Sequence, residues 1–165
     1  MITIIAGTNR EGSNTLKVAK EYQRFFAKKD VETTIFSLEK IDMLKRNDDF
    51  MALEETYLKP ADKFVFVLPE YNGAFPGVFK LMIDMTEISK CWPSKKVMLV
   101  GLAAGRAGNL RGLDAMTNIC NYIKLQVLPN KIPLSGIDTE LENQQFTKDE
   151  TIETIQTQIK QFISF

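Results

Sequence analysis

Short apolar runs alternate with amphipathic segments along the chain, and this alternation restricts the fold more than any other feature of the sequence. The apolar runs predict strands over residues 2–6, 31–38, 63–68, 96–103 and 125–129. The third and fourth runs contain KFVFVL and KVMLVGLA, which are almost continuously apolar, as in parallel strands covered on both faces. The alternation therefore predicts an α/β fold, a three-layer α/β/α sandwich around a five-stranded parallel sheet.

The segments between these strands have the apolar spacing of helices. Helices are predicted over 13–29 and 76–86, along the segment from Leu110 to Cys120, and at the C-terminal end. No internal repeat or low-complexity linker interrupts the pattern. We therefore expect a single domain over residues 1–165.

Several helix ends can be predicted from local signals. Pro76 suits the first position of its helix, because its missing N–H would have no partner there. Asp48 or Asp49 is the expected N-cap of a helix that ends before residue 60. Thr147 and Glu150 have the spacing of a capping box for the last helix.

Composition excludes several classes of protein. The 165 residues carry 21 basic and 21 acidic side chains, so no basic excess favours nucleic acid or an anionic membrane. The N-terminus has no signal-peptide pattern, and no apolar run approaches the length of a membrane span. We expect a cytoplasmic protein with no nucleic-acid or membrane partner. Cys91 and Cys120 are predicted to be reduced structural thiols.

The chain contains no His. This absence excludes Ser-His-Asp and Cys-His catalysis, zinc sites of the H-E-x-x-H type and the facial triad of non-haem iron. No metal site and no catalytic side chain are predicted, so a bound cofactor is expected to supply the chemistry.

Three loops rich in glycine and polar residues follow the first, third and fourth predicted strands. They are GTNREGSNT (residues 7–15, the first loop), PEYNGAFPG (69–77, the second loop) and AAGRAGN (103–109, the third loop). Parallel strands bring such loops together at the carboxyl edge of the sheet, where open α/β sheets bind ligands. The first loop lacks the Lys of a nucleoside-triphosphate loop and the G-x-G-x-x-G of a dinucleotide fold, which favours a smaller phosphate at a helix N-terminus.

The three loops resemble those of the NADPH-dependent FMN reductase family, flavodoxin-like proteins that include flavin, quinone, chromate and azo-dye reductases. The resemblance covers nearly the whole chain and is weakest over 39–60 and 130–146. It is most specific around the second loop, in Ala61-Asp62, Pro69-Glu70-Tyr71-Asn72-Gly73, Pro76-Gly77, Lys80 and Ile83-Asp84. The first loop is similar to the family's S-x-R-x-x-S pattern, with Thr8 in place of the first Ser, and the third loop keeps two glycines of S-x-G-x-x-G-G.

The resemblance implies FMN as the cofactor and assigns a part of it to each loop. A phosphate monoester is largely dianionic, and the first loop would bind it through Thr8, Arg10, Ser13, Asn14 and Thr15. The isoalloxazine would lie beside Pro69, Glu70, Tyr71, Asn72 and Gly73. The third loop would approach the pyrimidine side of the ring through Ala104, Gly105, Arg106 and Gly108.

The implied activity is hydride transfer from NADPH or NADH to bound FMN, and then reduction of a small-molecule acceptor such as a flavin or a quinone. Ala74 and Ala104 stand where the family usually has Ser, and Asn109 replaces a Gly, so FMN is expected to be held more weakly. Two alternatives remain open at this point. One is a flavodoxin-type electron-transfer protein, and the other is a flavodoxin-like binding protein without a cofactor.

The resemblance also implies a homodimer or homotetramer. The helix after the second loop carries more apolar side chains than one face of a sheet can cover: Phe75, Val78, Phe79, Leu81, Met82, Ile83 and Met85. We expect this helix to pack against a second copy, and Phe79→Asp with Met82→Asp to shift the protein toward monomer.

Overall fold

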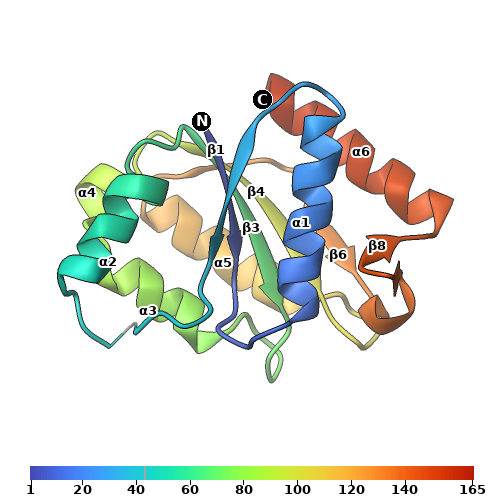
Figure 1. Ribbon diagram of the computed structural model, residues 1–165, viewed down its shortest axis with the longest axis horizontal. Helices are drawn as coiled ribbons and strands as arrows, with labels where there is room; N and C mark the ends of the chain where they lie inside the picture. The colour runs from blue at the N-terminus through green and yellow to red at the C-terminus, as the bar shows by residue number, and fades with distance from the viewer. Residues whose placement is uncertain (43) are drawn as a thin grey trace.

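The computed structural model describes residues 1–42 and 44–165, and Met43 of the segment 39–61 lies outside the described residues. A central parallel sheet has the order β2-β1-β3-β4-β5 (Figure 1). Its strands are β1 (Ile2–Ala6), β2 (Thr33–Ser37), β3 (Lys63–Pro69), β4 (Lys96–Leu102) and β5 (Gln126–Val127). The prediction of an α/β fold with a parallel sheet is confirmed.

The fifth position of the sheet is divided between two short strands. β5 pairs with the beginning of β4, where Val97 faces Val127, and β6 (Ile132–Leu134) pairs with its end, where Val100 faces Ile132. The sequence predicted one strand over 125–129 and missed β6. Pro133 lies in the middle of β6, and a residue without an N–H is tolerated there because, among the described residues, β6 pairs with β4 alone.

Helices cover both faces of the sheet (Figure 1). α1 (Asn14–Ala27) and α6 (Asp149–Ser164) pack on one face, and α3 (Gly77–Met85) and α5 (Leu110–Tyr122) pack on the other. Within β3, Phe66 faces the α3 and α5 side, whereas Val65 and Val67 face α1 and α6. The near-continuous apolar strands therefore contribute side chains to the hydrophobic core on each face of the sheet, as the sequence predicted.

Several predicted helix ends differ from the structure. Asn47 is the N-cap of α2 (Asp48–Leu53), because its side chain accepts a hydrogen bond from the N–H of Phe50 at 2.9 Å. The expectation of Asp48 or Asp49 was therefore wrong. Pro76 is the extended N-cap of α3 rather than its first helical residue.

The capping box predicted for α6 was also wrong. Lys148 is the N-cap of α6, and its side chain makes no capping bond. Thr147 lies outside the helix, and its N–H donates to the carbonyl oxygen of Glu140 at 3.4 Å. This contact belongs to a hairpin that the sequence did not reveal, formed by β7 (Leu141–Glu142) and β8 (Gln145–Phe146) after the 3₁₀ turn η2 (Ile137–Thr139).

The hairpin docks on α1. The N–H of Phe146 donates to the buried carboxylate of Glu21 at 3.1 Å, and Arg24 donates two hydrogen bonds of 2.7 Å to the same carboxylate. This long-range contact brings η2 close to the beginning of α1, and hence to the first loop.

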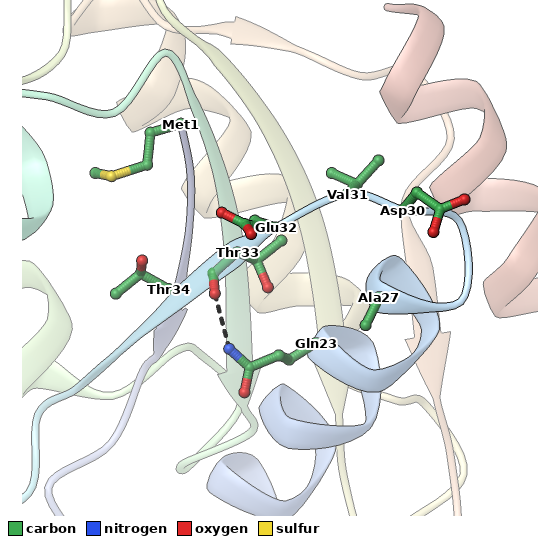
Figure 2. A pocket seen from close by; sticks show the side chains of 8 residues that line it. All are labelled: Met1, Gln23, Ala27, Asp30, Val31, Glu32, Thr33 and Thr34. Atoms are coloured by element: carbon green, nitrogen blue, oxygen red, sulfur yellow. Dashed lines mark hydrogen bonds between the residues drawn. The ribbon is translucent and has the colours of Figure 1, made fainter.

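An open groove of about 800 Å³ lies at the amino-terminal edge of the sheet, away from the three loops. The end of α1, the beginning of β2 and Met1 line it, and the amide of Gln23 donates to the carbonyl oxygen of Thr33 at 2.8 Å (Figure 2). Asp30 and Glu32 are its charged side chains. This groove is acidic and is poorly suited to a phosphate.

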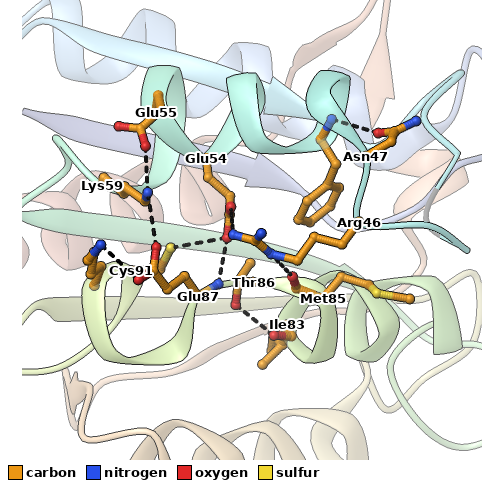
Figure 3. Close-up of polar contacts among 12 residues, drawn as sticks. Arg46, Asn47, Glu54, Glu55, Lys59, Ile83, Met85, Thr86, Glu87 and Cys91 are labelled. Carbon is orange, nitrogen blue, oxygen red and sulfur yellow. Dashed lines mark hydrogen bonds and ion pairs between the residues drawn. The ribbon is translucent and has the colours of Figure 1, made fainter.

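A buried carboxylate joins three segments between the α2–η1 side and the turn from α3 to α4 (Ile88–Cys91) (Figure 3). Glu54 begins the π-helix η1 (Glu54–Leu58) and is completely buried. It accepts hydrogen bonds of 2.5 Å from the guanidinium of Arg46 and from the N–H of Glu87, and Arg46 also donates to the carbonyl oxygen of Met85 at 3.0 Å. One acid therefore connects the segment before α2, η1 and the turn between α3 and α4.

Cys91 and Cys120 are free and buried, as predicted. Burial raises the pKa of each thiol to about 12, and the nearby charge of Glu54 adds to this effect at Cys91. Both thiols are therefore protonated at neutral pH and unreactive.

Phe79 and Met82 of α3 are completely buried in the core between the sheet and the helices. Phe79→Asp and Met82→Asp would therefore place charges in the core of one chain, so the shift toward monomer stays a prediction that these two changes cannot isolate. Among the described residues, no helix is both long enough and apolar enough to span a bilayer.

Candidate functional site

The three loops lie together at the carboxyl edge of the sheet, at the lower edge of Figure 1. The hydroxyl groups of Thr8 and Tyr71 are 2.7 Å apart and join the first loop to the second. The side-chain amide of Asn109 donates to the carbonyl oxygen of Pro69 at 3.1 Å and joins the third loop to the second. The expected convergence of the loops is confirmed.

The first loop presents a series of unpaired backbone donors. Within residues 1–42 and 44–165, the N–H groups of residues 11–15 have no protein acceptor. The hydroxyl of Ser13 caps α1 by accepting from the N–H of Leu16 at 3.3 Å, which leaves its own proton free. Such N–H groups at the beginning of a helix are a binding site for an anion.

Tyr71 lies against the first loop. Thr8 is 1% exposed, and its hydroxyl bonds to Tyr71 and also lies 3.4 Å from the backbone nitrogen of Arg10. The guanidinium of Arg10 stands over the ring of Tyr71, 4.0 Å from its centre. The side chain of Tyr71 therefore lies against the first loop, where the sequence alone did not place it.

Asn14 uses its side chain within the protein. Its amide donates to Asp138 of η2 at 2.7 Å, and its oxygen accepts from Lys17 at 3.0 Å. Thr15 is buried at the beginning of α1. These two residues can offer an anion their backbone N–H groups. The sequence reasoning missed Lys17 and Asp138, and the spacing of three residues between Asn14 and Lys17 was the available signal for the first of them.

The second loop begins with a two-residue hairpin turn. Asn72 and Gly73 have positive φ angles of 54° and 80°, and the backbones of Tyr71 and Ala74 exchange hydrogen bonds of 2.8 and 3.2 Å. Asn-Gly is the favoured pair for this geometry. Among the described residues, the N–H groups of Asn72 and Gly73 have no protein acceptor, whereas that of Glu70 donates to Leu102 at 2.8 Å.

The third loop is exposed from Ala104 to Arg106, and open space lies where a Cβ of Gly105 would stand. Gly108 is different, because it is buried and a Cβ there would collide with Pro133 of β6. Packing therefore explains the glycine at 108, and a contact of Gly108 with a ligand stays a prediction.

Three arginines surround the loops. Arg10, Arg106 and Arg111 are exposed, and none of them forms an ion pair with a described carboxylate. A Cβ at Gly73 would lie 3.8 Å from Nη1 of Arg111, so this guanidinium stands beside the hairpin turn. The sequence reasoning missed Arg111, although its place in the first turn of α5, just after the third loop, was a usable signal. The positive charge of these side chains favours an anionic ligand.

The fold and the site together define a flavodoxin-like protein with a first loop suited to a phosphate monoester. Among the described residues, N–H groups without an acceptor, an Arg10 without a carboxylate partner and the open space at Gly105 fit FMN, because they suit both its phosphate and a closely approaching ring.

The chain belongs to the NADPH-dependent FMN reductase family, whose family model matches residues 1–140. It is 26% identical over 141 residues to the NADPH azoreductase of Bacillus sp. (strain OY1-2), a match that covers 84% of this chain and 79% of that protein. Among solved structures, it is similar to the flavoenzyme NAD(P)H:acceptor oxidoreductase FerB from Paracoccus denitrificans, with a TM-score of 0.79, 18% identity, and coverage of 99% of this chain and 94% of FerB.

A flavodoxin from Streptococcus pneumoniae TIGR4 has the same fold, with a TM-score of 0.64, 11% identity, and coverage of 99% of this chain and 96% of the flavodoxin. The family membership decides between the alternatives that the sequence left open. The protein is an FMN-dependent NAD(P)H oxidoreductase.

Proposed function

We propose that the first loop binds the phosphate of FMN, that the second loop lies beside the isoalloxazine and that the third loop lies beside its pyrimidine side. The observation that carries this proposal is the run of N–H groups over residues 11–15 that have no acceptor among the described residues, beside the guanidinium of Arg10, which stacks on Tyr71 and pairs with no described carboxylate. The residues involved are Thr8, Arg10, Ser13, Asn14, Thr15, Pro69, Glu70, Tyr71, Asn72, Gly73, Ala104, Gly105, Arg106 and Gly108.

Bound FMN supplies the hydride chemistry, since it accepts two electrons from NAD(P)H and passes them to an acceptor. The residues of this chain bind and orient. Arg10 offsets the phosphate charge, and the N–H groups of Asn72 and Gly73, which have no acceptor among the described residues, are donors that the second loop can offer. Arg106 places a cation at the third loop, where it would stabilise negative charge on the reduced ring.

The acceptor that we propose is a small planar molecule such as a free flavin or a quinone. The exposed third loop and the exposed hairpin turn leave room for a second planar molecule beside the first. An azo compound is a further candidate, since a relative at 26% identity is an NADPH azoreductase.

The direct test is an anaerobic titration of the FMN-loaded protein with NADPH and, separately, with NADH. We expect the yellow colour to bleach with one equivalent of the preferred nicotinamide and to return when a quinone is added. A protein that keeps its colour with both nucleotides would contradict the enzyme and favour an electron carrier.

The phosphate assignment is tested by Arg10→Ala. We expect FMN affinity to fall by about 1.5 to 3 kcal/mol, roughly ten- to a hundredfold, while riboflavin affinity stays unchanged. Fluorescence titrations of both flavins give this comparison. Lys20→Ala, an exposed cation of α1, controls for net charge. Equal losses for FMN and riboflavin would place Arg10 away from the phosphate.

We also propose that the functional unit is a homodimer, with a homotetramer as a larger assembly of the same kind. A groove of about 410 Å³ runs between α3, α4 and α5, and Ile88 and the 88%-exposed Tyr122 contribute to its lining. These exposed apolar side chains, at the beginning of α4 and the C-terminal end of α5, support docking of a second copy.

A cytoplasmic location is consistent with the two free thiols and with the need for NAD(P)H. Cell fractionation tests this part of the proposal, and recovery in a membrane or secreted fraction would contradict it.

A further inference from the structure

Asn109 stands at the joint between the second and third loops. It precedes α5 as its N-cap, with a left-handed backbone at φ 67° and ψ 32°, and it is completely buried. An Asn at this position ordinarily accepts a bond from an N–H of its own helix. Here it makes no such bond, and Nδ2 instead donates to the carbonyl oxygens of Leu68 at 2.9 Å and Pro69 at 3.1 Å.

The peptide between Pro69 and Glu70 is consequently held through both of its polar groups. Its carbonyl oxygen accepts from Asn109, and its N–H donates to the carbonyl oxygen of Leu102 at 2.8 Å. Because both partners belong to the segment from β4 to α5, this peptide plane cannot rotate without losing a hydrogen bond. It is the first peptide of the second loop, so it sets the direction in which the hairpin turn leaves the sheet.

The oxygen of the Asn109 side-chain amide indicates that stability alone does not explain why Asn occupies this position. Oδ1 is buried and has no hydrogen-bond partner among the described residues. An unpaired buried oxygen is unfavourable. Gly112 accommodates the amide, because a Cβ at that position would overlap the side chain of Asn109. Asn109 and Gly112 are therefore a matched pair.

We propose that Asn109 is a positioning residue for the isoalloxazine side of the flavin site, which it serves by fixing the second loop against the third. The inference rests on the proposed function. The reductase pattern has a glycine at this position, so the family's loop makes no such side-chain contact.

Two variants test the role without relying on the activity of the loaded enzyme. Asn109→Asp keeps the size of the side chain but places an acceptor opposite two carbonyl oxygens. Asn109→Gly takes the left-handed backbone without strain and removes both bonds. Asn143→Asp is the matched control, since Asn143 is an exposed residue with φ 48° in the β7–β8 turn.

The first measurement is amide hydrogen exchange in the flavin-free protein. We expect exchange at Glu70 to become about fivefold faster or more in both Asn109 variants, as the loss of about one hydrogen bond implies, with no change at Thr8. The control variant should match the wild type. Unchanged exchange at Glu70 in Asn109→Gly would overturn the positioning role irrespective of any flavin.

The second measurement is flavin affinity. We expect FMN and riboflavin to weaken by the same factor, about five- to tenfold, with a changed visible circular dichroism of the bound flavin. A loss confined to FMN would place the effect at the phosphate and overturn the inference. A wild-type protein that binds neither flavin would overturn the proposed function itself, and the exchange rates would still report the contact of Asn109 with the second loop.

Discussion

At the scale of single residues, Tyr71 determines which hydroxyl group of the first two loops can donate to the proposed phosphate. Thr8, which replaces a family Ser, is 1% exposed, and the N–H of Arg10 already points to its oxygen. We expect the hydroxyl of Thr8 to donate its proton to the oxygen of Tyr71. The less buried hydroxyl of Tyr71 can then donate its own proton outward. We infer that Tyr71 rather than Thr8 presents the hydroxyl proton to the phosphate.

Tyr71→Phe should therefore weaken FMN about tenfold, near 1.4 kcal/mol, because a hydrogen bond to a charged group is lost. Riboflavin, which lacks the phosphate, should bind unchanged. Fluorescence titrations of both flavins measure the difference, and Tyr57→Phe, a half-buried tyrosine of η1 outside the three loops, is the control. Tighter binding of FMN by Tyr71→Phe would show instead that the tyrosine competes with the phosphate.

Gly112→Ala should change the free energy of unfolding in opposite directions in the wild-type chain and in the Asn109→Gly variant. Gly112→Ala in the wild-type chain would collide with Asn109 and lower the free energy of unfolding. With Asn109→Gly the space is empty, so the same change should raise stability by about 0.5 to 1 kcal/mol through helix propensity. Urea unfolding of the four proteins measures the cycle, and additive effects would contradict the pairing.

At the scale of elements, Glu54 holds the α2–η1–α4 side of the fold together (Figure 3). Glu54→Gln keeps an acceptor for the N–H of Glu87 but removes the charge that Arg46 faces. We expect the free energy of unfolding to fall by about 1.5 to 3 kcal/mol. Glu55→Gln, an exposed neighbour paired with Lys59, should leave the unfolding midpoint unchanged. Equal effects of the two variants would contradict a special role for the buried acid.

The elements that the sequence predicted well are those whose signal is local. β1, β3 and β4 are near-continuous apolar runs between turns, and α1 has a clear apolar face. The errors occur where several local signals compete or where a distant contact decides. Asn47, Asp48 and Asp49 can all cap a helix, and Thr147 is drawn away from α6 by Glu140. β6 has three residues and a central proline, which by itself argues against a strand.

The predictions for the site divide in the same way, between features set by local signals and contacts between distant residues. Parallel connectivity was sufficient to predict that the first, second and third loops meet at one edge. The pairings within that edge were not predictable, because they join residues far apart in the chain: Tyr71 with Thr8, Asn14 with Asp138, and Asn109 with Leu68. Asn109 was interpreted from the sequence as a loss, whereas the structure shows that it forms two hydrogen bonds.

At the scale of the whole molecule, the face formed by α3, α4 and α5 is where we expect a second copy. Tyr122 and Ile88 are 88% and 39% exposed, and the groove between them also contains Ile83 and Ile119. The groove lies along the C-terminal half of α3, whose first turn follows the second loop, so we expect a partner on this face to stabilise the hairpin turn through α3. Dimerisation and flavin binding should therefore support each other.

Tyr122→Asp should separate the subunits without unfolding them, because this side chain lies almost entirely outside the core of its own chain. At tens of micromolar we expect the wild-type protein to scatter light as a dimer and the variant as a monomer that releases FMN more readily. Ile163→Asp introduces the same charge at a 36%-exposed position of α6, on the other face of the sheet, and should remain dimeric. Circular dichroism melting of both variants checks that the fold is intact. A wild-type protein that stays monomeric at this concentration while it retains FMN would contradict the proposed assembly, and a dimeric Tyr122→Asp would move the interface to another face.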